Sequence, residues 1–279
     1  MSLLRIATVD FLNARPLIRG FTHAPLSSRV RLLSGTPAQC AHWLRHAETD
    51  VALIPSIEYL RIPGLRVLPL MAIAVRRQAR SVLLFSRVAA PEIRRVAVDQ
   101  SSRTSSALLR ILLNRRSRHR VDYREMEPSL GRMLASNDAA LLIGDAALKE
   151  DATGLKVYDL AAEWYAMTGL PFVFAFWAMR PGAILPDALE PFLESKRLGL
   201  AERERIACEA STELGLPAHD LIRYLHENIY YDLGVEEMKA LWLFYHMAKE
   251  ASLVGAAREV AFYEAPAPAA DPAPMGGVQ

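Results

Sequence analysis

The sequence has few cysteines, no long apolar run and no marked excess of charge of either sign. Its 279 residues include only Cys40 and Cys208, which are too few for the disulfide framework of a small secreted protein. No apolar stretch approaches the roughly 20 residues that cross a bilayer, and the first residues lack the basic and apolar regions of a signal peptide. We therefore expect a cytoplasmic protein with free thiols and no membrane insertion.

The charges of the chain nearly cancel, with 33 Lys and Arg against 31 Asp and Glu and a formal net charge of +2. This balance removes the bulk attraction by which basic proteins bind nucleic acids, and we expect no nucleic-acid partner. It does not exclude a local cationic pocket for a small anion. A hydrophobic content of 52% with 23% charged residues is typical of a folded globular chain.

Several motifs that would reveal a cofactor are also absent. The sequence has no GxGxxG dinucleotide loop, no Walker loop and no GxSxG nucleophile elbow. His42 and His46 have the spacing of a metal-binding pair on a predicted helix, but no motif supplies a third ligand. We predict neither a metal nor a cofactor.

The first half of the chain alternates short apolar runs with amphipathic stretches, which predicts βαβ units of an α/β fold. The predicted strands are Leu4–Val9, Val30–Leu33, Val51–Ile54, Val67–Ala74, Val82–Phe85, Val96–Val98, Ala140–Ile143 and Phe172–Trp177. The predicted helices are Pro37–His46, Thr104–Arg116, Ser129–Ala135 and Ala146–Lys149. From Leu200 to Phe262 the pattern is helical, with helices over Ala218–Tyr230 and Glu236–Ala251, and the Pro/Ala-rich residues 265–279 are predicted to be disordered.

Polar residues gather where four predicted strands end and a helix begins. These segments are residues 7–17, 51–59, 96–106 and 141–145, and Arg80 with Ser81 opens a further strand. In open α/β sheets, ligands bind beyond the carboxyl ends of the strands. We therefore expect these segments to line one crevice.

The third of these segments points to an anion site. Ser101 or Ser102 suits the N-cap of the following helix, and the first turn holds Arg103 and hydroxyl groups but no acidic residue. A helix N-terminus carries about half a positive charge and free N–H groups, so it favours a carboxylate or a phosphate. The alternative is a plain Ser/Thr cap on a surface helix, and the other polar strand ends favour the ligand site.

Six sequence blocks in register resemble the chorismate dehydratase family of futalosine-pathway menaquinone biosynthesis. The blocks are Asp10–Leu17, Ala52–Tyr59, Arg80–Ser86, Ser101–Ser105, Leu141–Leu148 and Thr168–Ala175. The resemblance implies a two-lobed type II periplasmic-binding-protein-like fold with a central ligand cleft and a helical C-terminal segment. It implies a first lobe of residues 1–87 and 175–264 and an inserted second lobe of residues 88–174.

The resemblance also implies an activity, the elimination of water from chorismate to give 3-[(1-carboxyvinyl)oxy]benzoate. Chorismate carries two carboxylates, for which Arg15, Arg80 and Arg103 are candidate partners. We expect Asn13 and Ser81 to lie closest to the reacting groups. The full set of expected substrate-binding residues is Arg15, Ser56, Arg80, Ser102, Arg103, Thr104, Ser105, Gly144 and Asp145.

The identity of the base stays open at the level of sequence. The polar strand ends contain no His, Lys or Cys, and their carboxylates are Asp10, Glu58, Asp99 and Asp145. Each of the four has an alternative role as a helix or turn residue. Our hypothesis is that the protein orients and desolvates the substrate, and that a substrate carboxylate folded over the ring acts as the base.

Two other functions compete with the dehydratase. One is a small-anion-binding protein that performs no chemistry, since a fold does not fix a function. The other is the later naphthoate synthase of the same pathway. The sequence also leaves open whether the aromatic cluster Trp242, Phe244, Tyr245 and Met247 packs in the core or in a homodimer interface.

Overall fold

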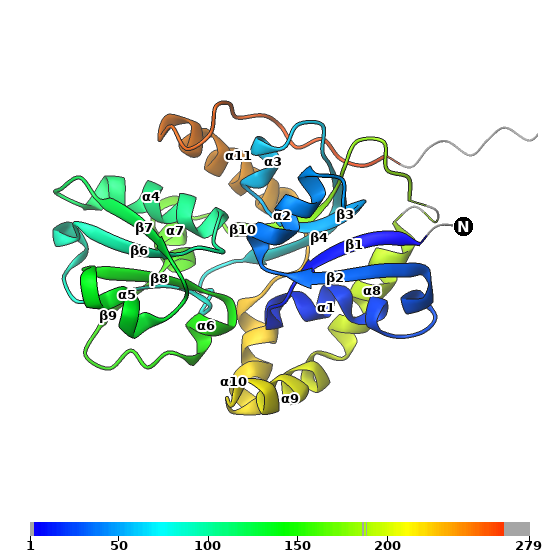
Figure 1. The fold of residues 1–279 in the computed structure, drawn as a ribbon, viewed down its shortest axis with the longest axis horizontal. Coiled ribbons are helices and arrows are strands. Elements are labelled where there is room, and N and C mark those ends of the chain that lie inside the picture. Colours follow the sequence, from blue (N-terminus) through cyan, green and yellow to red (C-terminus); the bar gives the residue numbers. More distant parts are fainter. Residues whose placement is uncertain (1–2, 186, 188, 265–279) are drawn as a thin grey trace, which may run out of the picture.

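Two five-stranded sheets, each flanked by helices, form the body of the protein (Figure 1). The computed structural model describes residues 3–185, 187 and 189–264, so the predicted disordered segment 265–279 lies outside the described residues. The first sheet has the order β2-β1-β3-β10-β4. Its strands are β1 (Leu4–Val9), β2 (Val30–Gly35), β3 (Val51–Pro55), β4 (Arg66–Val75) and β10 (Phe172–Met179).

The second sheet has the order β7-β6-β8-β5-β9. Its strands are β5 (Val82–Ser86), β6 (Arg95–Asp99), β7 (Asp122–Met126), β8 (Ala139–Ile143) and β9 (Lys156–Asp159). Each sheet contains three neighbouring parallel strands, which are β2, β1 and β3 in the first sheet and β7, β6 and β8 in the second. The next strand, β10 in the first sheet and β5 in the second, is antiparallel to both of its neighbours. The parallel strands of each sheet therefore end at the same edge, which brings the polar segments that follow them close together, as expected from the sequence.

The chain passes between the sheets twice, and the strand pairing shows where. β5 pairs with β8 and β9, so it belongs to the second sheet, although the sequence resemblance places residues 1–87 in the first lobe. All of β10 pairs with β3 and β4 in the first sheet. Because strand pairing defines a sheet, we propose that the lobes join at residues 76–81 and 169–171, a few residues before the expected boundaries.

The helices lie on both faces of the sheets, and the C-terminal helices add to the first lobe (Figure 1). Those of the first 170 residues are α1 (Arg15–Ile18), α2 (Pro37–Arg45), α3 (Glu58–Arg61), α4 (Thr104–Arg116), α5 (Leu130–Ser136), α6 (Gly144–Lys149) and α7 (Leu160–Thr168). The C-terminal ones are α8 (Glu190–Ala201), α9 (Arg203–Leu214), α10 (Ala218–Arg223) and α11 (Val235–Glu250), and a π-helical turn Tyr224–Asn228 follows α10. None of the helices described is both long and apolar enough to span a bilayer.

Sequence reasoning missed the strands β7 and β9 and the helices α7 and α8. The two strands have little apolar surface. β7 and β9 are edge strands, and their residues are exposed or only half-buried, so they lack the apolar pattern of a buried strand. By contrast, α4 runs from Thr104 to Arg116 as predicted, because its apolar residues are buried along most of its length.

Aromatic side chains hold the C-terminal helices and the lobe junction together. Phe192 of α8 contacts Phe21 and Trp177, with ring centroids 5.0 and 5.3 Å apart. Phe172 of β10 contacts Phe244 of α11 at 4.9 Å. In the cluster from α11, Phe244, Tyr245 and Met247 are buried and Trp242 is 55% exposed, so most of this cluster packs in the core.

Candidate active site

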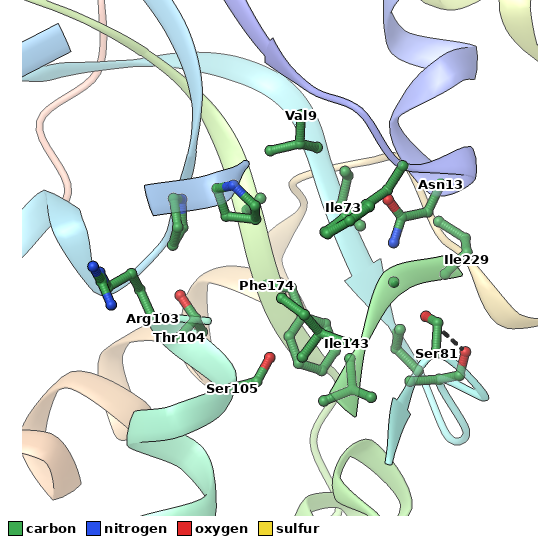
Figure 2. A pocket seen from close by; sticks show the side chains of 18 residues that line it. Val9, Asn13, Ile73, Ser81, Arg103, Thr104, Ser105, Ile143, Phe174 and Ile229 are labelled. Carbon is green, nitrogen blue, oxygen red and sulfur yellow. Dashed lines mark hydrogen bonds between the residues drawn. The ribbon is translucent and has the colours of Figure 1, made fainter. Parts of the chain in front are cut away.

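A cavity lies between the two sheets, at the edge where the polar strand ends meet (Figure 2). Its empty volume is about 580 Å³, including its opening to solvent. Both lobes contribute to the wall. It is lined by Val9, Phe11, Asn13, Pro37, Pro55, Ile73, Val75, Ala79, Ser81, Val82, Arg103, Thr104, Ser105, Ile143, Gly144, Phe174, Ala175 and Ile229.

One end of the cavity is formed by the start of α4, which we call the α4 end. Figure 2 shows Arg103, Thr104 and Ser105 together on this side. The first turn of α4 has no acidic residue and no side chain that caps it from the N-cap position. The amide of Ser106 donates to Ser102 Oγ at 3.1 Å, whereas those of Thr104 and Ser105 have no acceptor among the described residues. This end therefore presents free N–H groups and a partial positive charge.

Arg103 adds a full positive charge to the α4 end. Its guanidinium donates to the carbonyl oxygen of Gln100 at 3.2 Å and lies 3.8 Å from the Glu125 carboxylate. Glu125 is mostly exposed, so this ion pair is weak and competes poorly with a buried ligand. Of the three arginines proposed as carboxylate partners, Arg103 is the one that lines the cavity.

The opposite end of the cavity, which we call the Ser81 end, carries neutral polar groups. Asn13 comes from the short turn Leu12–Ala14 after β1, and Ser81 immediately precedes β5. Ser81 is buried; its Oγ donates to the carbonyl oxygen of Ala79 at 3.3 Å and accepts from the Tyr224 hydroxyl at 2.7 Å. The buried Oδ1 of Asn13 has no hydrogen-bond partner among the described residues. Leaving a buried acceptor without a hydrogen bond costs free energy. Asn13 Oδ1 is therefore suited to accept a hydrogen bond from a ligand.

Tyr224 is the residue of this end that sequence reasoning missed. It lies on the helical C-terminal segment, where its position fits the periodicity of a core residue and gives no other signal. Burial raises the pKa of Tyr224, although its contacts with Ser81 and Asn13 oppose that shift. The phenol therefore stays neutral and serves as a donor.

The cavity wall does not include five of the expected binding residues, Arg15, Ser56, Arg80, Ser102 and Asp145. The Arg15 guanidinium pairs with Glu213 of α9 at 2.5 Å. Arg80 lies in a turn with φ of 57° whose backbone N–H donates to Asp159 at 2.7 Å. Ser56 Oγ donates to the carbonyl oxygen of Val173 at 2.8 Å. Ser102 Oγ is occupied by the α4 amide, so these groups shape the site without facing the cavity.

Asp145 contacts the other lobe and does not line the cavity. Asp145 Oδ1 of α6 accepts from the backbone N–H of Leu12 at 3.0 Å across the lobe junction. Burial raises the pKa of Asp145, while the Leu12 amide and the Arg15 charge lower it. Gly144 does line the wall, with φ of 61°, and a Cβ there would come within 2.8 Å of the Phe11 ring. A side chain at 144 would therefore displace the Phe11 ring, and the positive φ disfavours any residue other than glycine there.

The other candidate bases are also engaged elsewhere. Glu58 is buried and pairs with Arg45 at 3.2 Å and with Arg61 at 2.8 Å. Asp99 accepts from the amide and the hydroxyl of Ser101 at 2.8 and 2.7 Å, and burial raises its pKa. Asp10 is exposed. Among the described residues, the wall therefore contains no carboxylate, histidine, lysine or cysteine.

The histidine pair noted in the sequence has a third neighbour in the structure. Glu48 joins His42 and His46, and their ligand atoms lie within 4.8 Å of one another. All three side chains are exposed, and none of them lines the cavity. This surface group is separate from the candidate active site.

Comparison with known proteins identifies the family. The family model described as menaquinone biosynthesis matches residues 4–250, which is most of the chain. The chain belongs to the menaquinone biosynthesis family. It is similar to the chorismate dehydratase of Thermus thermophilus, with 34% identity over 239 residues that cover 76% of this chain and 88% of that protein. It is also similar to the chorismate dehydratase of Campylobacter jejuni, with 28% identity over 88% of this chain and 97% of that protein.

This member of the menaquinone biosynthesis family has the fold expected from the sequence resemblance. It superposes on the periplasmic aliphatic sulphonate binding protein of Escherichia coli with a TM-score of 0.64 at 16% identity, covering 100% of this chain and 95% of that one. The expected two-lobed type II periplasmic-binding-protein-like fold is thereby confirmed. At this identity the likeness shows the fold alone.

Proposed function

We propose that this member of the menaquinone biosynthesis family is a chorismate dehydratase, a hydro-lyase that removes water from chorismate to give 3-[(1-carboxyvinyl)oxy]benzoate. The observation that carries the proposal is the match to two curated chorismate dehydratases over 76% and 88% of the chain. The two-ended cavity supports it, because chorismate is a small dianion with a hydroxyl group on its ring.

The α4 end suits a carboxylate of the substrate. Thr104 and Ser105 offer free amides at a helix start, and the Arg103 charge lies at the same end. Bonds from charged or dipolar donors to a carboxylate are stronger than neutral ones. The apolar remainder of the wall excludes water from the ring and strengthens these contacts.

The Ser81 end suits the reacting carbon atoms. The reaction removes a proton from the ring carbon that bears the enol ether and the hydroxyl group from its neighbour, and the product ring is aromatic. Asn13 and Ser81 supply an acceptor and a donor for the hydroxyl that leaves. Because no described residue of the wall carries a carboxylate or an imidazole, a substrate carboxylate takes the ring proton. The electron pair of that C–H bond forms the new ring double bond as the C–O bond breaks, and the departing hydroxide takes the proton back from the substrate carboxyl group to form water.

The test is to incubate the purified protein with chorismate and to follow the ultraviolet spectrum. We expect loss of the diene absorption and gain of an aromatic product, with equimolar water formed by the stoichiometry. If the spectrum stays unchanged while a thermal shift still detects the binding of chorismate, the protein is an anion-binding protein and not a dehydratase. A protein that neither binds nor converts chorismate would direct attention to the later naphthoate synthase reaction.

Two further expectations accompany this function. A cytoplasmic location suits an enzyme whose substrate is an intermediate of cellular metabolism, and fractionation of cells tests it. The chain is either a monomer or a homodimer, and light scattering of the purified protein distinguishes the two.

A further inference from the structure

We propose that Tyr224 is a positioning residue of the reaction: its hydroxyl binds Ser81 and thereby directs the Ser81 proton toward the substrate. This proposal rests on the proposed function. Tyr224 is 1% exposed and is the first residue of the π-helical turn that follows α10. Its hydroxyl donates to Ser81 Oγ at 2.7 Å. A side chain from the C-terminal helical segment thus reaches the residue at the start of β5 in the other sheet.

The hydrogen-bonding capacity of a serine hydroxyl explains the effect of this contact. A serine has one proton to donate and two lone pairs that accept. Tyr224 fills one lone pair of Ser81 and, as the donor of that bond, leaves the Ser81 proton available for donation at the cavity. Two hydroxyls in series also polarise one another, which strengthens the second donor.

The present acceptor of the Ser81 proton is a weak one. The distance from Ser81 Oγ to the Ala79 carbonyl oxygen is 3.3 Å, longer than the roughly 2.7–2.8 Å typical of O–H···O bonds. Ser81 and Ala79 both line the cavity. A substrate hydroxyl bound there would therefore be a better acceptor of the Ser81 proton than the Ala79 carbonyl oxygen. The unpaired Oδ1 of Asn13 at the same end supplies the complementary acceptor for the proton of that hydroxyl.

Tyr224 itself has no acid role in this arrangement. Its burial favours the neutral phenol at every pH at which the protein is assayed. It donates one hydrogen bond and keeps its proton, so no bond is formed or broken on Tyr224 during turnover. Its contribution therefore passes wholly through Ser81.

The experiment is a double-mutant cycle with Tyr224→Phe, Ser81→Ala and the double variant. Phenylalanine keeps the ring that fills the core and leaves Ser81 free to donate to Ala79, so folded protein is expected. Tyr224→Phe should lower kcat about tenfold, the effect of one well-placed hydrogen bond, and should leave KM within about twofold. In the Ser81→Ala background it should lower kcat no further.

Tyr231→Phe is the matched control. Tyr231 is also buried, and its hydroxyl has no hydrogen-bond partner among the described residues, so its loss should leave kcat unchanged. The proposal is overturned if Tyr224→Phe leaves kcat unchanged, or if it lowers kcat equally in both backgrounds. Should the unmutated protein bind chorismate without converting it, the proposed function has failed, and the same cycle measured on Kd tests the Tyr224–Ser81 coupling alone.

Discussion

The α4 end and the Ser81 end of the cavity differ in the origin of their polarity. At the α4 end, backbone amides of Thr104 and Ser105 and the Arg103 charge present a positive potential that is fixed by one helix. At the Ser81 end, Asn13, Ser81 and Tyr224 come from three separate parts of the chain and carry no charge. A fixed potential favours the binding of an anion, whereas neutral groups held at short distances favour the orientation of reacting bonds. The comparison predicts that changes at the two ends affect different kinetic constants.

The largest expected effect comes from the Ser81 end. Asn13→Ala and Ser81→Ala should each lower kcat by about 100-fold, because groups that act on the transition state typically contribute that much. KM should change by less than about threefold. Steady-state kinetics on chorismate measure both constants. Ser86→Ala is the control, since it removes another buried hydroxyl, which donates to Val88 at 2.8 Å at the far end of β5, and a comparable loss of kcat in this control would contradict the assignment.

The next largest effect is expected at the α4 end. Arg103→Ala should raise KM about tenfold with kcat nearly unchanged, because it removes one charge-assisted contact to a substrate carboxylate. Arg115→Ala removes the same charge from the exposed last turn of α4 and should leave KM unaltered. If Arg103→Ala lowers kcat and not the affinity, the division of labour between the two ends is incorrect.

A smaller effect, on stability alone, is expected for Glu58. Glu58→Gln removes the charge that pairs with Arg45 and Arg61 and should lower the free energy of unfolding by about 1 kcal/mol, since both arginines keep partial access to water. Urea denaturation measures this loss. Turnover per folded molecule should persist, and a folded variant that binds chorismate but does not convert it would make Glu58 the base.

The smallest effect is expected for Asp145, and it depends on pH. Burial raises the Asp145 pKa above its ordinary value of 3.8, so the unfolded chain loses this proton first and stability falls as pH rises through the raised pKa. Asp145→Asn cannot ionise, and its Oδ1 can still accept from Leu12. We expect its Tm at neutral pH to exceed that of the unmutated protein by roughly 1–3 °C. The difference should vanish below the ordinary pKa.

Turnover of the same variant tests the Ser81 end. A kcat of Asp145→Asn within about threefold of the unmutated value would agree with an end that uses no protein carboxylate. Complete loss of turnover in a folded, substrate-binding variant would identify Asp145 as the base. Calorimetric scans from pH 3 to 8, together with the ultraviolet assay, supply both measurements.

Local patterns predicted a large part of the fold and some of the cavity wall. The apolar run before Asp99 and the acid-free turn at Thr104 and Ser105 were enough to place a strand, a helix start and an anion-favouring end. These features depend on neighbours in sequence, because strand burial and helix caps are set within a few residues. Patterns of this kind do not say which of several arginines lines a cavity, and of the three candidates Arg103 does so.

The sequence by itself determined the α/β class, the family resemblance and the absence of an acid from the first turn of α4. Tertiary structure alone decided that Arg15 meets Glu213, that Asp145 receives the Leu12 amide and that Tyr224 meets Ser81. The physical reason is chain distance. These three contacts join residues 198, 133 and 143 positions apart, and such pairs are chosen by the packing of whole elements. The Ser81 end of this cavity is therefore a product of the tertiary structure, while the α4 end is already present in a few consecutive residues.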